Sequence, residues 1–203
     1  MSKVTVMRGL LALVALMFAA TMVAAGDRLF DAVAAGDAGA VEQALAAGAA
    51  VDARAPDQAT PLINAALADQ PAIAELLIGK GANAMARNSG GFTPLHAAAF
   101  SGSVPISKLL LDHGATLDDA ANKAGVTPLM VAGEENHVAL ATFLITEGAD
   151  VGKAEVHGYT PITRAFWKGN TDIVRLFKRH GATCPPASFL GEQDYAKCME
   201  IRD

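Results

Sequence analysis

Small apolar residues recur along most of the chain in pairs of short runs. In one such pair, an alanine-rich run follows Thr93-Pro94, Gly102 interrupts it, and a second run places Ile106 and Leu110 at helical spacing. Threonine can cap a helix start, and proline suits the first helical position, where its missing N–H costs nothing. Glycine accepts a left-handed turn. The stretch therefore predicts two short helices joined by a tight turn.

The same unit recurs with a period near 33 residues. Thr-Pro opens it four times, and a Gly-Ala pair follows each threonine at a constant distance, where a helix end favours a left-handed residue. A degenerate copy without Thr-Pro begins near Asp27 and is expected to cap the N-terminal end, because end repeats are atypical. The threonines are Thr60, Thr93, Thr127 and Thr160, and the glycines are Gly81, Gly114, Gly148 and Gly181.

A period near 33 with Thr-Pro-Leu-His-x-Ala at 93–98 closely resembles the ankyrin repeat family. The resemblance covers about residues 27–184. It implies an all-α solenoid of about five helix–turn–helix units with hairpin loops, in a domain of residues 26–184. The expected units are 27–59, 60–92, 93–126, 127–159 and 160–184.

Departures from the repeat pattern lead to local predictions. His96 alone keeps the histidine of the motif. The glycine between the two helices is replaced by Asp69 and Asn136, which tolerate left-handed geometry better than most residues. One extra residue lies in the loop between Asp118 and Gly125, so this loop should bulge relative to its neighbours.

Residues 1–25 are typical of a signal peptide. Lys3 and Arg8 precede an uncharged apolar run, and small residues place the expected cleavage between Ala25 and Gly26. This favours a periplasmic or secreted protein with no membrane contact after cleavage. The alternative is an uncleaved membrane anchor, although the uncharged run is only marginally long enough to span a bilayer.

Residues 185–203 are expected to form a capping segment for the last unit. Pro185 and Pro186 end the preceding helix. From about Glu192, the apolar residues Tyr195, Cys198 and Met199 lie at helical spacing and predict a short helix, and we interpret the segment as a cap on the exposed apolar side of the last repeat.

The two cysteines, Cys184 and Cys198, bracket this segment. In an exported protein, such a pair favours a disulfide, which closes a loop of about 15 residues and adds about 3 kcal/mol in the chain-entropy model. The alternative is a redox or metal-binding pair, but CxxC spacing is absent.

Charge and motifs exclude several function classes. The chain has 16 Lys and Arg against 21 Asp and Glu, which argues against nucleic-acid binding through a basic face. We find no catalytic motif and no cofactor fingerprint. His113 and His180 occupy the same place two units apart, roughly 20 Å, which is too far to share a metal. We therefore predict no catalytic, cofactor or metal site.

The family resemblance places partner contacts on the hairpin tips and on the concave face of the first helices. Aromatic and charged residues gather at those positions, and exposed aromatics form binding hot spots. The alternative for Phe92 and Tyr159 is packing against the next loop. The candidate partner-binding residues are Phe92, Phe100, Glu134, Glu135, Tyr159, Trp167 and Lys168.

These observations favour a non-catalytic scaffold that is monomeric alone and binds a protein partner in an extracytoplasmic compartment. An accessory or inhibitory subunit that protects or regulates an exported enzyme is the main alternative. A membrane-anchored ankyrin protein is a weaker one. Nothing in the sequence supports an enzyme.

Overall fold

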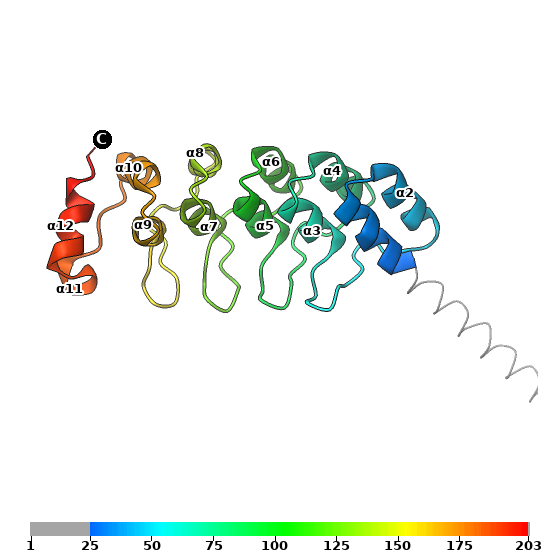
Figure 1. The fold of residues 1–203 in the computed structure, drawn as a ribbon, viewed down its shortest axis with the longest axis horizontal. Helices are drawn as coiled ribbons and strands as arrows, with labels where there is room; N and C mark the ends of the chain where they lie inside the picture. The colour runs from blue at the N-terminus through cyan, green and yellow to red at the C-terminus, as the bar shows by residue number, and fades with distance from the viewer. Residues whose placement is uncertain (1–24, 203) are drawn as a thin grey trace, which may run out of the picture.

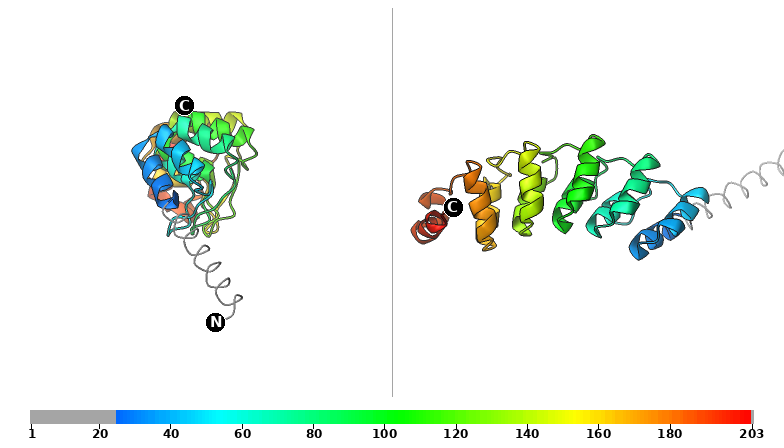
Figure 2. Two further views of the ribbon diagram at one scale, coloured as in Figure 1. Left: turned by 90° about the vertical axis from the view of Figure 1, so that its right-hand side faces the viewer. Right: turned by 90° about the horizontal axis from the view of Figure 1, so that it is seen from above.

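The computed structural model describes residues 25–202, and these form a row of five helix pairs followed by a two-helix tail (Figure 1). Hairpin loops lie along one side of the row, the first helix of each pair lies in the middle, and the second helix lies on the opposite side (Figures 1 and 2). The helices are residues 25–35, α2 (Ala38–Ala46), α3 (Pro61–Leu67), α4 (Pro71–Gly79), α5 (Pro94–Ser101), α6 (Val104–Asp112), α7 (Pro128–Glu134), α8 (Val138–Thr146), α9 (Pro161–Trp167), α10 (Thr171–Arg179), α11 (Ala187–Leu190) and α12 (Glu192–Glu200).

The predicted all-α repeat solenoid is therefore confirmed. The predicted signal peptide lies outside the described residues except for Ala25, which is helical and buried. Within residues 25–202, no helix combines the length and the apolar character that a membrane crossing requires.

The Thr-Pro pairs begin the inner helices as their chemistry predicts. The hydroxyl of Thr60 accepts a hydrogen bond from the backbone N–H of Ile63 at 3.3 Å, and Thr127 does the same for Met130 at 3.2 Å. Proline occupies the first helical position in α3, α5, α7 and α9. Each start is thus fixed locally, which explains why the helices keep a common register along the row.

The turn between the two helices of each pair has one left-handed residue. Gly102 has φ +79°, while Asp69 and Asn136 have φ values of +49° and +61° at the corresponding places. The prediction that Asp and Asn would adopt glycine's conformation here is confirmed. An added Cβ at Gly102 would lie 2.5 Å from the His137 ring, so this turn needs glycine for space as well.

Small residues in the inner helices let neighbouring pairs approach closely. Ala66 and Ala99 are fully buried, and the residue in register with them in α7 is Gly133. An added Cβ at Gly133 would lie 2.9 Å from the ring of Phe177. Phe177 takes the place that leucine holds in the three preceding outer helices, so the larger ring of α10 is matched by a smaller residue in α7.

Polar contacts join consecutive units at their turns and hairpins. The His137 ring donates from Nε2 to the carbonyl of Phe100 at 2.8 Å. In the next unit, Asn170 donates from Nδ2 to the carbonyl of Gly133 at 2.8 Å. Hairpins are also linked near their tips, where Val156 N–H donates to the Ala124 carbonyl at 3.1 Å. The first two bonds reach backbone carbonyls in the last turns of α5 and α7, and the third joins two hairpins, so each unit is tied to the next at both places.

The extra residue of the third hairpin lies just before its tip. Gly125 N–H donates to the Asn122 carbonyl, as Gly91 does to Asn88 one unit earlier, so the tip turn itself is unchanged. The added length falls between Asp119 and Asn122, and a bend occurs at Asn122. The predicted irregularity thus lies in the part of the loop before its tip.

Asp119, beside this insertion, forms a bidentate ion pair with Arg87 of the preceding hairpin, at 2.5 and 2.9 Å. The Asp119 side chain is buried, and its pKa lies below the ordinary value because the guanidinium of Arg87 donates hydrogen bonds to the carboxylate. The ion pair therefore fixes the second and third hairpins relative to each other.

The C-terminal tail is joined to the last repeat by a disulfide between Cys184 and Cys198, as predicted. Lys178 of α10 donates to the carbonyls of Cys198 and Ile201 at 2.6 and 2.8 Å. Cys198 is fully buried, but Met199 is about half exposed. The short helix expected from about Glu192 is α12, which turns Cys198 inward and leaves Met199 on its outer side, and Ile201 packs on the core after the helix ends.

Candidate partner-binding surface

Apolar side chains on the last turns of the inner helices form one exposed row. Leu67, Phe100 and Trp167 hold the same position in α3, α5 and α9, with exposed fractions of 45%, 53% and 49%. Glu134 holds that position in α7. Leu67, Phe100 and Trp167 are exposed although other residues of the same helices are buried in the core. A row of exposed apolar side chains is typical of an interaction surface.

A groove of about 280 Å³, which we call the apolar groove, lies along this row and crosses four units. Its volume is at the lower end for ligand pockets and suits one or two side chains better than a large small molecule. The lining residues are Ile63, Leu67, Asn88, Phe92, Thr93, His96, Ala97, Phe100, Val126, Val131, Glu134, Glu135 and Arg164.

The polar atoms at the floor of the apolar groove already have partners. His96 is 2% exposed, and its Nε2–H donates to the carbonyl of Val126 at 2.9 Å. Its Nδ1 accepts from the hydroxyl and the backbone N–H of Thr93, at 2.9 and 3.3 Å. Asn88 Oδ1 accepts the backbone N–H of Phe92 at 3.0 Å. The floor therefore offers an occupant apolar contact rather than hydrogen bonds.

His96 makes the stability of the fold depend on pH. Burial lowers the pKa of His96 below its ordinary value of 6.5, and the nearby Arg87 charge acts in the same direction, against the Val126 hydrogen bond and the Asp119 charge. The unfolded chain therefore binds the proton more readily. The stability from neutral His96 is present above about pH 6.5 and is lost as the pH falls through the lower folded pKa.

We expect the free energy of unfolding to fall as the pH drops below about 6.5, with a slope of at most about 1.4 kcal/mol per pH unit from this one group. Urea titrations at several pH values measure the slope. The variant His96→Gln should flatten it, and His113→Gln is the control for the loss of an exposed histidine. An unchanged slope in His96→Gln, or an equal change in both variants, would contradict the assignment.

The charged residues at one end of the apolar groove pair mainly with one another. Glu134 accepts Nε–H of Arg164 at 3.0 Å and contacts Lys168 Nζ at 3.2 Å, so one carboxylate of α7 joins two cations of the last repeat. Glu135 lies next to it, exposed, and forms no ion pair or side-chain hydrogen bond with the residues that the structure describes. Of the two adjacent glutamates, Glu135 alone is available to a partner.

Aromatic rings form the other end of the surface. Tyr159, on a hairpin, lies edge-on to Trp167, with ring centroids 4.7 Å apart. Phe189 of α11 lies edge-on to Tyr159 at 5.4 Å and nearly parallel to Trp167 at 6.4 Å. The tail therefore packs on one side of this cluster, while Trp167 and Phe189 stay partly exposed.

The hairpin that carries Tyr159 is shaped by a buried carboxylate. Glu155 Oε1 accepts the backbone N–H groups of His157 and Tyr159, at 2.9 and 3.1 Å, and Oε2 lies 3.0 Å from His157 Nδ1. Burial raises the pKa of Glu155, but these hydrogen bonds outweigh it and lower the pKa below its ordinary value. A charged Glu155 thus holds the hairpin in the shape that brings Tyr159 to Trp167.

All seven candidate residues lie along one continuous surface. Phe92, Phe100, Glu134 and Glu135 line the apolar groove, and Glu134 is shared with a second pocket of about 350 Å³ that Tyr159, Trp167 and Lys168 line. Phe92 also packs edge-on against His96 of α5, at a ring distance of 5.3 Å, and Tyr159 packs against Trp167 of α9, so both rings contact inner helices.

The sequence analysis missed four contributors to this surface. Leu67 lies in register with Phe100, and Val131 and Arg164 share a second register one turn earlier, so the 33-residue period contained the signal for all three. Phe189 lies in the tail, outside the repeats, and no periodic signal points to it.

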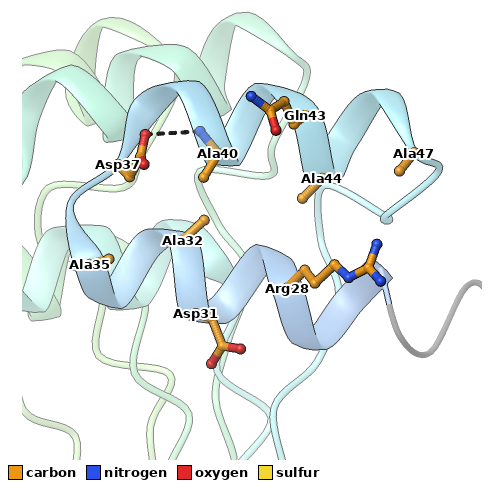
Figure 3. Close-up of a pocket in the computed structure, with 9 residues that line it drawn as sticks. All are labelled: Arg28, Asp31, Ala32, Ala35, Asp37, Ala40, Gln43, Ala44 and Ala47. Carbon is orange, nitrogen blue, oxygen red and sulfur yellow. Dashed lines mark hydrogen bonds between the residues drawn. The ribbon is translucent and has the colours of Figure 1, made fainter.

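A third groove lies in the first described helix pair, away from the candidate residues (Figure 3). It has a volume of about 370 Å³ and runs between the helix of residues 25–35 and α2. Its walls are mostly alanine, and Asp37 caps α2 by accepting the Ala40 N–H at 2.9 Å. Asp37 thus serves the local fold.

Comparison with known families gives one match. The model described as ankyrin repeats (three copies) matches residues 29–121 and 116–186. These ranges begin within the helix of residues 25–35, reach all five helix pairs and end at the start of the tail. The chain matches none of the curated proteins with which it was compared.

Proposed function

Because this chain belongs to the ankyrin repeat family, we propose that it is a non-catalytic scaffold that binds a protein partner in an extracytoplasmic compartment. Ankyrin repeats are generally protein–protein interaction modules, which supports the scaffold role. The site of contact that we propose is the surface of the inner helices and hairpin tips, from Leu67 to Trp167.

The observation that carries this proposal is the exposed row of Leu67, Phe100 and Trp167 on rigid helices. The core does not require an apolar side chain at any of these positions, since each lies on the outer side of its helix. A preformed surface of this kind binds with little ordering cost. Exposed aromatics on such a surface are the residue types that dominate binding energy.

The extracytoplasmic location rests on two further observations. The N-terminal sequence is typical of a signal peptide, and the two cysteines form a disulfide. Disulfides persist mainly in oxidising compartments. Together they favour a periplasmic or secreted protein that is cleaved before Gly26.

Affinity capture with crosslinking in the native host tests this function. Wild-type protein and the double variant Phe100→Ala, Trp167→Ala are isolated from the extracytoplasmic fraction, and bait and prey are identified by mass spectrometry. We expect a prey that the double variant loses, because two aromatic anchors are removed. Bait that begins at Gly26 would support cleavage.

The control is Val138→Ala, Met199→Ala, which removes two exposed apolar side chains from other elements. This variant should keep the prey. A prey retained by the Phe100→Ala, Trp167→Ala variant, or lost equally from both variants, would refute this surface as the binding site. Intact bait that is found only in membranes would instead favour the anchored form.

A further inference from the structure

The apolar groove combines an apolar floor with one available negative charge at its edge. The ring nitrogens of His96 and the Asn88 Oδ1 atom are occupied within the fold, so the floor has little to offer a polar group. Burying an unpaired polar group there would cost free energy. An aliphatic or aromatic side chain loses nothing by entering and removes apolar surface from water.

Glu135 places an exposed negative charge at one edge of this groove. Arg164 and Lys168 of the last repeat are both engaged by Glu134, while the exposed Glu135 carboxylate has no ion pair among the described residues. Phe100, on the same groove, presents a half-exposed ring. A basic side chain can lie on an aromatic face and pair with a carboxylate at once.

The charge of the whole chain acts in the same direction. Without Lys3 and Arg8, which precede the expected cleavage site, the balance is 14 − 21 = −7. A negative molecule attracts basic segments over a distance and repels acidic ones. The local charge and the long-range field therefore select the same kind of partner.

We propose that the apolar groove binds a linear segment of a protein partner that carries one large apolar side chain next to a lysine or arginine. The apolar side chain enters between Phe92, Phe100 and Val131, and the basic group pairs with Glu135. This inference rests on the proposed scaffold function and adds the chemical class of the partner to it.

Selection from a displayed library of random linear peptides tests the inference, with the full disulfide-bonded protein as the target. We expect enriched peptides to contain a large apolar residue within a few positions of Lys or Arg. The strongest of them, made synthetically, should bind Glu135→Lys about tenfold more weakly than wild type, because attraction becomes repulsion. Phe100→Ala should weaken binding by a similar factor.

Glu147→Lys is the matched control, since it reverses an exposed glutamate on the outer helix layer at the end of α8. It should bind the peptide as wild type does. A second selection on Glu135→Lys should enrich acidic instead of basic residues beside the apolar one. An unfolded variant would enrich no peptides with this pattern, so a change from basic to acidic preference cannot result from loss of folding.

Three outcomes would overturn the inference: no enrichment, enrichment without a basic bias, or equal binding by Glu135→Lys. Concentration-dependent self-association that competes with the peptides would assign the groove to a second copy of the chain instead. The scaffold function is judged separately. A prey that depends on Phe100 and Trp167 in the capture experiment keeps that function even if the peptide preference fails.

Discussion

Reduction of the Cys184–Cys198 disulfide should lower the free energy of unfolding by about 3 kcal/mol, the value for a closed loop of this length in the chain-entropy model. Residues 184 to 198 contain α11 and most of α12, and Cys198 is the one buried residue of these two helices. Without the covalent link, the tail would depend on noncovalent contacts, among them the Lys178 hydrogen bonds, the Phe189 ring contacts and the packing of Ile201.

Urea unfolding followed by far-ultraviolet circular dichroism, with and without a reductant, measures this effect. The double variant Cys184→Ser, Cys198→Ser should show the lower stability without reductant and no response to it. Hydrogen exchange should rise in α9 and α10, beside the tail, more than in α2. This local effect is expected because repeat units contact only their neighbours. Equal unfolding midpoints with and without reductant would contradict the prediction.

Gly133→Ala should destabilise the protein by about 1–3 kcal/mol, although alanine is the better helix former. The new methyl group would lie 2.9 Å from the ring of Phe177, which is fully buried, so one of the two must shift within the packed core. The same alanine should be harmless, or stabilising, once the ring is replaced by leucine. Phe177→Leu alone should cost roughly 1 kcal/mol for the space it leaves.

The double variant Gly133→Ala, Phe177→Leu restores the alanine and leucine found at these positions in the preceding units. A double-mutant cycle by chemical denaturation gives the coupling energy. We expect Gly133→Ala to change sign between the two backgrounds. Additive effects would show that Gly133 and Phe177 are not a matched pair. Gly79→Ala is the control, because an added Cβ there meets no atom within 4 Å.

The sequence predicted the helices well because their signals are local. A Thr-Pro start and a left-handed turn residue act within a few residues of the chain, and they recur at the same places in each unit. The tail lacks such a period. Helical spacing indicated that Cys198 and Met199 share a helix, but only the contacts with α10 decide that Cys198 faces inward.

The candidate surface was predicted in outline and not in its pairings. The repeat register placed the seven residues on one side. It could not indicate that Glu134 would join Arg164 and Lys168, because this depends on how α9 is rotated against α7. Nor could it indicate the contact between Phe189 and Trp167, since a chain-distant tail supplies the second ring.

Trp167, which is the chain's single tryptophan, lies where the last repeat meets the tail. Its fluorescence emission therefore reports on the C-terminal end of the row alone, whereas circular dichroism reports on every helix. If the alanine-rich first pair unfolds before the rest, ellipticity will fall while emission stays constant. Release of the tail will do the opposite, with a change in emission and little loss of helix. Recorded together, the two signals distinguish which end of the molecule opens first.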